Sequence, residues 1–341
     1  MLFLTRDLFS KKLTILFLII LGTYGCKTKT SSEQTAEQAP ALVKSPEFNA
    51  DSAYQFVQKQ VDFGPRVPNT APHKACGNYL VSTLKKYGFS VVEQTFKDTT
   101  FDGTIINGRN IIGSFNTANA KRILLTSHWD SRPFSDQDSL VKNKPVMGAN
   151  DGASGVGILL EIARVLSLQA TKPDIGVDII FFDVEDWGAT EQDTSMLHSG
   201  FCLGSQYWAA NKHIPNYTAY FGVLLDMVGA KGATFLKEGY SMQMAEDVVR
   251  EVWTTASRIG YNNYFIDERG GSITDDHVPV NTVAHIPMID IIHTKNSVVR
   301  TFFDQWHTAD DTMEHIDPKT LKAVGQTLVQ VLYQESANLA L

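Results

Sequence analysis

The chain has 341 residues, a formal net charge of −7 at pH 7, and 43% hydrophobic residues. This composition is ordinary for a globular protein, and about 300 residues beyond the N-terminal region are enough for one large enzyme domain. The acidic balance and the lack of a basic patch argue against a surface that neutralises phosphates, so nucleic acid is not an expected partner.

The N-terminus has the pattern of an export signal. Arg6, Lys11 and Lys12 form a positive region, and a largely apolar run follows at 13–21. That run is shorter than the about 20 apolar residues that a membrane span needs, but it suits the core of a signal peptide. We therefore expect residues 1–25 to be a signal peptide.

Cys26 stands where a bacterial lipoprotein is processed. It follows the small residue Gly25 at the end of the apolar core, although Thr23 occupies a position where leucine is usual. We expect Cys26 to be acylated, which would make the protein an exported, membrane-anchored lipoprotein of a bacterial envelope, periplasmic or surface-facing. Ordinary cleavage of a secretory signal and an uncleaved anchor are the alternatives.

The segment 26–45 is expected to be a flexible tether, because it is rich in Thr, Ser, Gln, Glu and Ala and cannot bury enough apolar surface to become ordered. The remaining residues, 46–341, are expected to form a single catalytic domain. Cys76 and Cys202 are the other two cysteines. They would be able to pair in an oxidising compartment, but nothing in the sequence places them close together.

From residue 46 onward, helical and strand patterns alternate. Helices are predicted at 51–61, 73–87, 156–168, 204–210, 242–259 and 318–335. Strands are predicted at 90–96, 110–113, 122–127, 177–184, 220–227 and 286–292. This alternation predicts an α/β fold, a three-layer α/β/α sandwich with a central, largely parallel sheet. Ligands bind such sheets beyond the carboxyl ends of the strands.

Acids and histidines gather at those predicted strand ends. Five junctions carry them: His128 and Asp130, Asp151, Glu185 and Asp186, Asp226, and His307. A single acid or histidine in such a place often only caps a helix or binds a turn. Five junctions with oxygen and imidazole donors and no cysteine favour Zn²⁺ in an open site, with three protein ligands and a water or substrate.

The same segments carry a family resemblance. From about Asp51 to the end, the chain resembles the zinc aminopeptidase superfamily (peptidase family M28), and more closely its glutaminyl cyclase branch. The resemblance implies a mixed, mostly parallel twisted sheet of the zinc exopeptidase type. The runs that carry it are LLTSHWDSRPF, GANDGASGVGILLEIARVL, IIFFDVEDWG, GSQYWA, LLDMVGA, DDHVPV and DQWHTADDT.

The resemblance also implies roles for single residues. Asp151, Asp186 and His307 match the three zinc ligands, and Glu185 matches the general base or acid. Position 186 is an aspartate where the superfamily usually has glutamate. The arm is one methylene shorter, so either the backbone approaches the metal or coordination is weaker.

Further acids and histidines match a second layer of the site. Asp226 and Asp275 match two acids of a hydrogen-bond network in cyclases, and His128 with Asp226 matches the residues that hold a second zinc in aminopeptidases. Asp130 is expected to orient the imidazole of His128. The chain retains every ligand for two metals, and cyclases that bind one zinc retain them too, so the ligand set leaves the number of zinc ions open.

Two features favour the cyclase. Trp306 directly precedes His307, and the run around Asp275 reproduces the cyclase pattern. An indole beside a metal forms an apolar wall suited to an N-terminal glutamine side chain, with Phe302 and Trp187 as further candidates for substrate binding. Trp187 has the alternative of being a core residue, and residues 189–200 are either a loop over the site or a surface insertion.

The sequence thus predicts a glutaminyl-peptide cyclotransferase, which converts the N-terminal glutamine of a peptide or protein to pyroglutamate and releases ammonia, with one Zn²⁺ as cofactor. A di-zinc aminopeptidase that releases N-terminal amino acids is the main alternative. A non-catalytic relative that binds partners at a surface is a further alternative, which the complete set of catalytic residues argues against.

Overall fold

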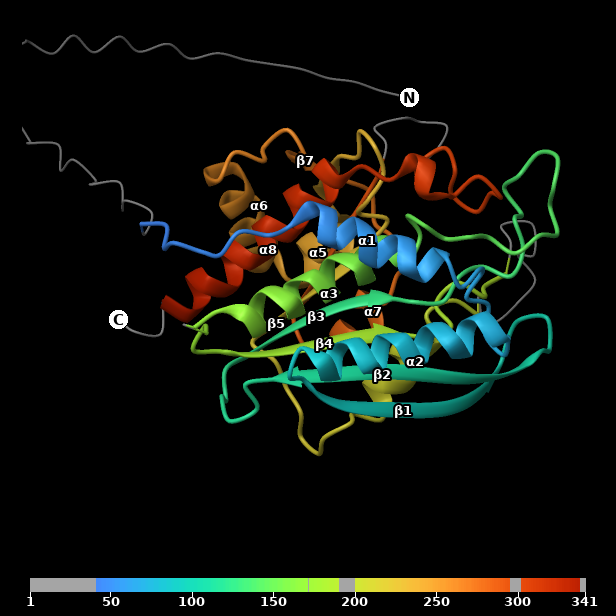
Figure 1. The fold of residues 1–341 in the computed structure, drawn as a ribbon, viewed down its shortest axis with the longest axis horizontal. Coiled ribbons are helices and arrows are strands. Elements are labelled where there is room, and N and C mark those ends of the chain that lie inside the picture. Colours follow the sequence, from blue (N-terminus) through green and yellow to red (C-terminus); the bar gives the residue numbers. More distant parts are fainter. Residues whose placement is uncertain (1–40, 171, 190–199, 295–301, 338–341) are drawn as a thin grey trace, which may run out of the picture. The chain divides into compact units, whose positions relative to one another are not determined.

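The computed structural model describes residues 41–170, 172–189, 200–294 and 302–337 (Figure 1). The chain divides into a unit Met1–Ala41 and a compact unit Leu42–Leu341, and the helices and strands of the described residues belong to the second. The predicted signal peptide, Cys26 and nearly all of the predicted tether lie outside the described residues, as does most of the loop predicted at 189–200. Among the described residues, no helix combines the length and apolar character needed to cross a membrane.

A six-stranded sheet forms the centre of the fold, in the order β1-β2-β4-β3-β5-β8. The pairs β3–β4, β3–β5 and β5–β8 are parallel, whereas β1–β2 and β2–β4 are antiparallel. The predicted mixed, mostly parallel sheet is confirmed. The strands are β1 (Ser90–Thr99), β2 (Ile105–Phe115), β3 (Arg122–His128), β4 (Gly176–Phe182), β5 (Phe221–Asp226) and β8 (Met288–Ile292).

Helices cover both faces of this sheet. The helices are α1 (Ala50–Val61), α2 (Ala71–Lys86), α3 (Ala153–Leu168), α4 (Leu203–Ala210), α5 (Gly239–Met244), α6 (Glu246–Arg258), α7 (His277–Thr282) and α8 (Pro318–Ala337). The helices α1, α2, α3 and α8 lie together on the face that Figure 1 turns toward the viewer, and α4 and α7 pack on the opposite face.

Alternating side chains of the strands supply the two halves of the core. In β3, Ile123 and Leu125 pack into the larger apolar cluster beneath α1, α3 and α8, while Leu124 faces the smaller cluster beneath α4 and α7. Residues 180 and 181 of β4 divide between the clusters in the same way. Strands buried on both faces leave their polar residues for the strand ends, where the site forms.

The structure corrects several details of the prediction. The helix predicted at 242–259 is two helices, because Ala245 adopts a non-helical conformation (φ −148°, ψ 46°) between α5 and α6. Two short strands, β6 (Phe235–Lys237) and β7 (Phe265–Arg269), form a separate two-stranded sheet, and neither they nor α7 were predicted. Strands of three and five residues carry too little alternation to be recognised. Cys76 and Cys202 are both buried and free.

Candidate active site

A cavity of about 600 Å³ lies beyond the carboxyl ends of β4 and β5. Its walls come from separate segments of the chain, which is the arrangement that the predicted strand ends required. Most of the predicted site residues line it: Asp151, Glu185, Asp186, Asp226, Asp275, Phe302, Trp306 and His307. His128, Asp130 and Trp187 are not part of this lining.

The three predicted zinc ligands converge at the cavity. One donor atom from each of Asp151, Asp186 and His307 lies within 4.8 Å of the other two, and all three residues are buried. Nε2 of His307 is 3.0 Å from Oδ1 of Asp186 and 3.7 Å from Oδ2 of Asp151. Because the residues are separated by up to 156 positions, only the fold brings these donors together.

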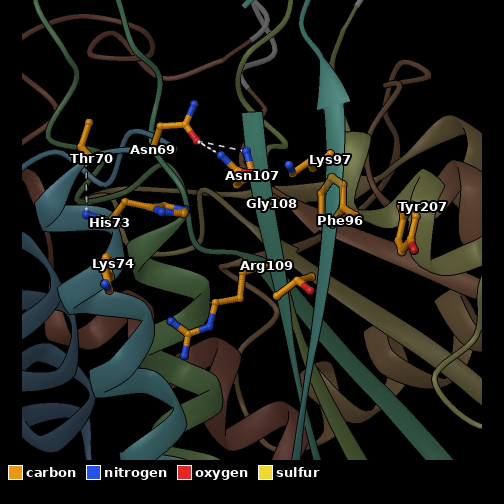
Figure 2. Close-up of a pocket in the computed structure, with 11 residues that line it drawn as sticks. Asn69, Thr70, His73, Lys74, Phe96, Lys97, Asn107, Gly108, Arg109 and Tyr207 are labelled. Carbon is orange, nitrogen blue, oxygen red and sulfur yellow. Dashed lines mark hydrogen bonds between the residues drawn. The ribbon is translucent and has the colours of Figure 1, made fainter. Parts of the chain in front are cut away.

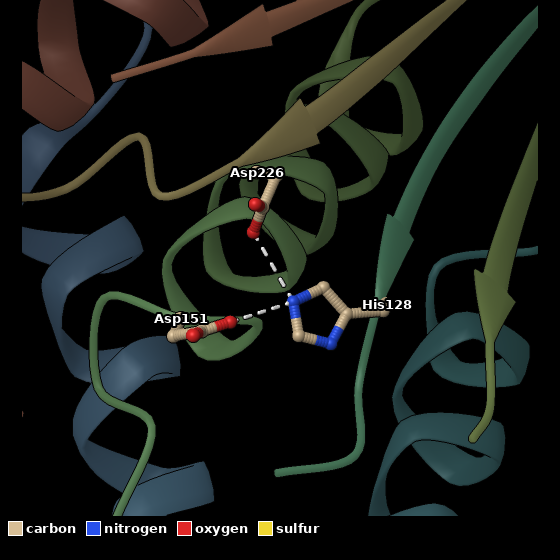
Figure 3. A group of neighbouring side chains, drawn as sticks. All are labelled: His128, Asp151 and Asp226. Atoms are coloured by element: carbon tan, nitrogen blue, oxygen red, sulfur yellow. Dashed lines mark hydrogen bonds and ion pairs between the residues drawn. The ribbon is translucent and has the colours of Figure 1, made fainter. Parts of the chain in front are cut away.

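A second group of donors shares Asp151 with the first. Nε2 of His128 lies 3.0 Å from Oδ1 of Asp151 and 3.1 Å from Oδ1 of Asp226 (Figure 3). The other carboxylate oxygen of Asp151 is the one that faces His307. Asp151 therefore lies between two neighbouring groups of potential ligands.

A sharp turn after β4 presents Glu185 and Asp186 to the cavity. Val184 has a left-handed backbone (φ 56°), which is unusual for a branched side chain. The carboxylate of Asp130 accepts hydrogen bonds from the backbone N–H groups of both Glu185 and Asp186, at 3.1 and 3.2 Å. Asp130 Oδ1 also lies 3.5 Å from Nδ1 of His128, the imidazole that it was predicted to orient. The hydrogen bonds of its carboxylate to backbone N–H groups stabilise the turn.

Hydrogen bonds to its backbone hold Asp151 in position. The carboxylate of Asp311 accepts hydrogen bonds from the N–H groups of Asn150 (2.8 Å) and Asp151 (3.0 Å). The next residue, Gly152, has φ +85°, and a Cβ there would lie 2.9 Å from the carbonyl oxygen of Asp130. Only glycine fits this position without a shift of its neighbours.

Arg132 supports the short arm of Asp186. Its guanidinium donates to the backbone oxygen of Asp186 at 3.1 Å and lies 3.3 Å from Oδ1 of the same residue. It also pairs with Asp136, which lies 3.5 Å from Nδ1 of His307. Burial would lower the pKa of His307, but Asp186 and Asp136 more than offset this effect and raise it.

The donor set fits a divalent metal ion. Burial raises the pKa of Asp226 to about 6, with the Asp151 charge contributing, and burial together with the Asp226 charge raises the pKa of Asp275 to about 7. These carboxyls therefore lack enough cationic partners to hold their charges at low cost. A metal ion would supply that positive charge, and carboxylate and imidazole donors are ligands of zinc.

Glu185 combines access to the cavity with burial. Its side chain is 13% exposed, and burial raises its pKa well above the usual range, with His128 opposing and Asp275 and Asp186 adding to the shift. The thiol of Cys202 donates a hydrogen bond to Oε1 of Glu185 at 3.3 Å. This contact could not be predicted from the sequence, because nothing in the local pattern connects Cys202 with a residue 17 positions earlier.

Two aromatic rings form the apolar wall near the ligands. Trp306 stacks on the His307 imidazole with ring centroids 3.7 Å apart, and Phe302 lies 4.7 Å from Trp306. Trp187 instead packs among Val67, Phe96 and Ile106, and its indole N–H donates to Asp102. The structure thus places the Trp187 side chain in a core cluster.

A second cavity, of about 740 Å³, lies apart from these residues, between the start of α2 and strands β1 and β2 (Figure 2). Asn69 accepts hydrogen bonds from the backbone and side chain of Asn107 at its edge. None of the predicted catalytic or metal-binding residues lines it. The candidate active site is therefore the smaller cavity.

Comparisons with known proteins agree with this geometry. A crystal structure of a Zn-dependent exopeptidase from Parabacteroides distasonis is 54% identical, covering 85% of this chain and 99% of that chain, with a TM-score of 0.83. A crystal structure of Bacteroides thetaiotaomicron glutaminyl cyclase bound to N-acetylhistamine is 50% identical with the same coverage and a TM-score of 0.82.

A curated relative is similar at lower identity. The glutaminyl-peptide cyclotransferase of Bos taurus is 28% identical over 253 residues, which are 67% of this chain and 66% of the bovine protein. The family itself, Peptidase family M28, matches residues 110–332, a span that contains both groups of potential ligands, Glu185 and the aromatic wall. The chain belongs to peptidase family M28.

Proposed function

We propose that this protein is a zinc-dependent glutaminyl-peptide cyclotransferase, which acts on peptide or protein N-termini. The observation that carries the proposal is the position of Glu185 and Asp275 in one cavity with the Asp151, Asp186 and His307 group. The likeness to bacterial glutaminyl cyclases at about half identity over most of the chain supports the same reaction.

Asp151, Asp186 and His307 would hold one zinc ion. When bound, zinc acts as a Lewis acid toward the γ-carbonyl oxygen of the substrate glutamine. With only three protein ligands, such a site would have room for a substrate oxygen, as other catalytic zinc sites do. Arg132 and Asp311 keep two of these ligands in place through the contacts described above.

Glu185 is assigned the proton transfers. It accepts a proton from the substrate α-amine as the amine nitrogen bonds to the carbonyl carbon of the side-chain amide, and it returns the proton to the amide nitrogen, whose bond to that carbon breaks as ammonia leaves. The ring closes within one molecule, so attack needs no second substrate and starts from a high effective concentration. The raised pKa of Glu185 suits a group that must both accept and return a proton near neutral pH.

The other residues orient the substrate. Trp306 and Phe302 give an apolar surface for the glutamine side chain, and the wall excludes water that would compete with the amine. Asp226 and Asp275 are assigned to the substrate-facing acid network beside Glu185. Trp187 has no place in this assignment because it does not line the cavity.

A di-zinc aminopeptidase is the second candidate. The observation that favours it is the second donor group of His128, Asp151 and Asp226, whose donor atoms also lie within 4.8 Å of one another. In that case Glu185 would activate water, and the products would be a free amino acid and a shortened peptide.

Mass spectrometry of a peptide that begins with glutamine separates the two reactions. Cyclisation lowers the peptide mass by one molecule of ammonia, whereas an aminopeptidase removes the whole first residue. We expect the ammonia loss, together with about one zinc per chain. Release of N-terminal leucine by a preparation with two zinc ions per chain would establish the aminopeptidase instead.

For the location of the enzyme, we propose export and lipidation at Cys26. Support comes from the sequence alone: the basic start, the apolar run and Gly25 before Cys26. A lipid on Cys26 would attach the catalytic domain to a membrane of the cell envelope through residues 26–45.

A further inference from the structure

We infer that Cys202 is a positioning residue, whose thiol fixes the orientation of the Glu185 carboxylate in the cavity. The inference rests on the proposed function only in giving Glu185 the proton transfers. The contact itself is independent of which reaction the enzyme performs.

Two hydrogen bonds join Cys202 to Glu185, and a third joins the residues next to them. The thiol donates to Oε1 of Glu185 at 3.3 Å, a normal length for a hydrogen bond from sulfur, and the backbone N–H of Cys202 donates to the carbonyl oxygen of Glu185 at 2.9 Å. The N–H of Leu203 donates to the carbonyl of Val184 at 3.0 Å. The start of α4 is therefore held against the turn that carries the proposed base.

The backbone at Cys202 indicates that its side chain has a use. Cys202 has φ 59°, in the left-handed region that glycine adopts at no cost and a side chain occupies only at a penalty. The residue at this position is nevertheless a cysteine. It is 2% exposed, and its thiol contacts the carboxylate of Glu185. Burial and the Glu185 charge raise the pKa of the Cys202 thiol, so it stays protonated and able to donate.

Fixing one carboxylate oxygen determines the position of the other. With Oε1 bound to the thiol, the carboxylate cannot rotate freely, and Oε2 stays near Nδ1 of His128, at 4.0 Å. Asp275 lies beside the same contact: one donor atom each of Glu185, Cys202 and Asp275 lies within 4.8 Å of the other two. A proton acceptor held in one orientation reaches its transfer geometry more often than one that rotates.

Two substitutions separate the hydrogen bond from the shape of the residue. Cys202→Ala removes the donor, and Cys202→Ser keeps a hydroxyl donor in a side chain of similar size. Branched residues are unsuitable controls because a left-handed backbone penalises them. We expect Cys202→Ala to lower kcat about 10-fold, the order expected for losing a hydrogen bond to a charged group. KM, zinc content and Tm should change little, and Cys202→Ser should recover most of kcat.

Equal kcat values for Cys202→Ala and the wild type would overturn the inference, as would a serine variant as impaired as the alanine variant. If the wild type releases N-terminal leucine and does not cyclise glutamine, the same comparison is made in that assay. Failure of the proposed function is then visible in the wild type alone, and failure of the inference in the ratio of the variants.

Infrared spectroscopy of the full chain tests the contact without activity. The spectrum of the wild type minus that of Cys202→Ser isolates the S–H stretch of Cys202. Removing the acceptor with Glu185→Ala should move this band to a higher frequency, toward that of a free thiol. The Cys76 band, isolated in the same way with Cys76→Ser, should not move. A Cys202 band that ignores the loss of Glu185 would contradict the hydrogen bond directly.

Discussion

Asp311 holds the backbone of Asp151 from behind the site: its Oδ2 accepts the Asp151 N–H at 3.0 Å, across 160 positions of sequence. The other oxygen accepts the N–H of Asn150. The carboxylate of Asp151 is thereby free to face His128 and His307, while its main chain is tied to the segment that follows His307. Asp311 thus connects the backbones around Asp151 and His307, two of the proposed zinc ligands, and is not itself a ligand.

Replacing Asp311 should therefore weaken metal binding. Asp311→Ala leaves two buried N–H groups without an acceptor, and partners behind a ligand typically contribute 10- to 100-fold to metal affinity. We expect a loss of this order in zinc affinity, measured by competition with a chromophoric chelator. Asp310→Ala, at the exposed neighbouring position, is the matched control and should retain wild-type affinity.

Glu185 and Asp186 should separate proton transfer from metal binding. Glu185→Gln keeps the shape of the side chain but cannot accept a proton, so kcat should fall by roughly 10²- to 10⁴-fold with zinc retained. Asp186→Ala removes a charged ligand and should lose the metal. Zinc titration and single-turnover cyclisation measure both effects. Loss of zinc from the glutamine variant with retention in the alanine variant would mean that the two roles are reversed.

Trp306 should govern substrate affinity. Trp306→Ala removes the apolar wall, and we expect KM for a glutaminyl peptide to rise about 10-fold, since burial of an apolar side chain contributes about 1.5–3 kcal/mol. Trp187→Ala is the comparison, because this buried indole does not line the cavity. It should lower Tm and leave KM nearly unchanged. The opposite pattern would transfer the binding role to Trp187.

Glu251, far from the cavity on α6, should make stability depend on pH. Burial and the neighbouring Glu335 on α8 raise its pKa from 4.5 to about 8, with Lys121 opposing. The folded protein then binds a proton that the unfolded chain releases, so this contribution is complete below about pH 4.5 and is lost as pH rises through about 8.

Glu251→Gln removes that titration. The variant should have the higher Tm of the two at about pH 9 and nearly the same Tm at about pH 5. Glu268→Gln, at an exposed position of β7, controls for the loss of one surface charge. Parallel Tm–pH curves for wild type and Glu251→Gln would show that Glu251 titrates normally in the folded state.

Cys26→Ser should release the protein from the membrane fraction. The substitution removes the proposed acylation site and leaves the catalytic domain intact, so activity toward a soluble peptide should not change. Cell fractionation with immunoblotting measures the distribution. Unchanged membrane association would indicate an uncleaved N-terminal anchor.

Much of the fold and the place where the site forms could be predicted from the sequence for one physical reason, whereas the three zinc ligands were assigned from the family resemblance. Parallel strands end at the same edge of a sheet, so the acids at or just beyond the ends of 122–127, 177–184 and 220–227 are expected to approach one another. The six predicted strands are confirmed because alternation and short apolar runs both indicate strands. The helix at 242–259 failed because the break at Ala245 depends on tertiary structure, which the helical periodicity does not record.

The supporting contacts were beyond sequence reasoning. Asp130 was expected to serve His128, and its hydrogen bonds to the Glu185 and Asp186 amides depend on the left-handed turn at Val184. Asp311 and Cys202 act through hydrogen bonds to residues 160 and 17 positions away, and such contacts leave no periodicity and no local motif in the sequence. Such residues are found only when the backbone geometry is known.

The shared position of Asp151 also bears on how enzymes of this kind can diverge. Its two oxygens face two donor groups, and Nε2 of His128 contacts both Asp151 and Asp226. A lineage that gains or abandons the second metal therefore need not lose a ligand or leave a buried carboxylate without a partner at any intermediate step. Substitutions in the residues that line the cavity can therefore come first, and a change in the number of metal ions and in the reaction can come later.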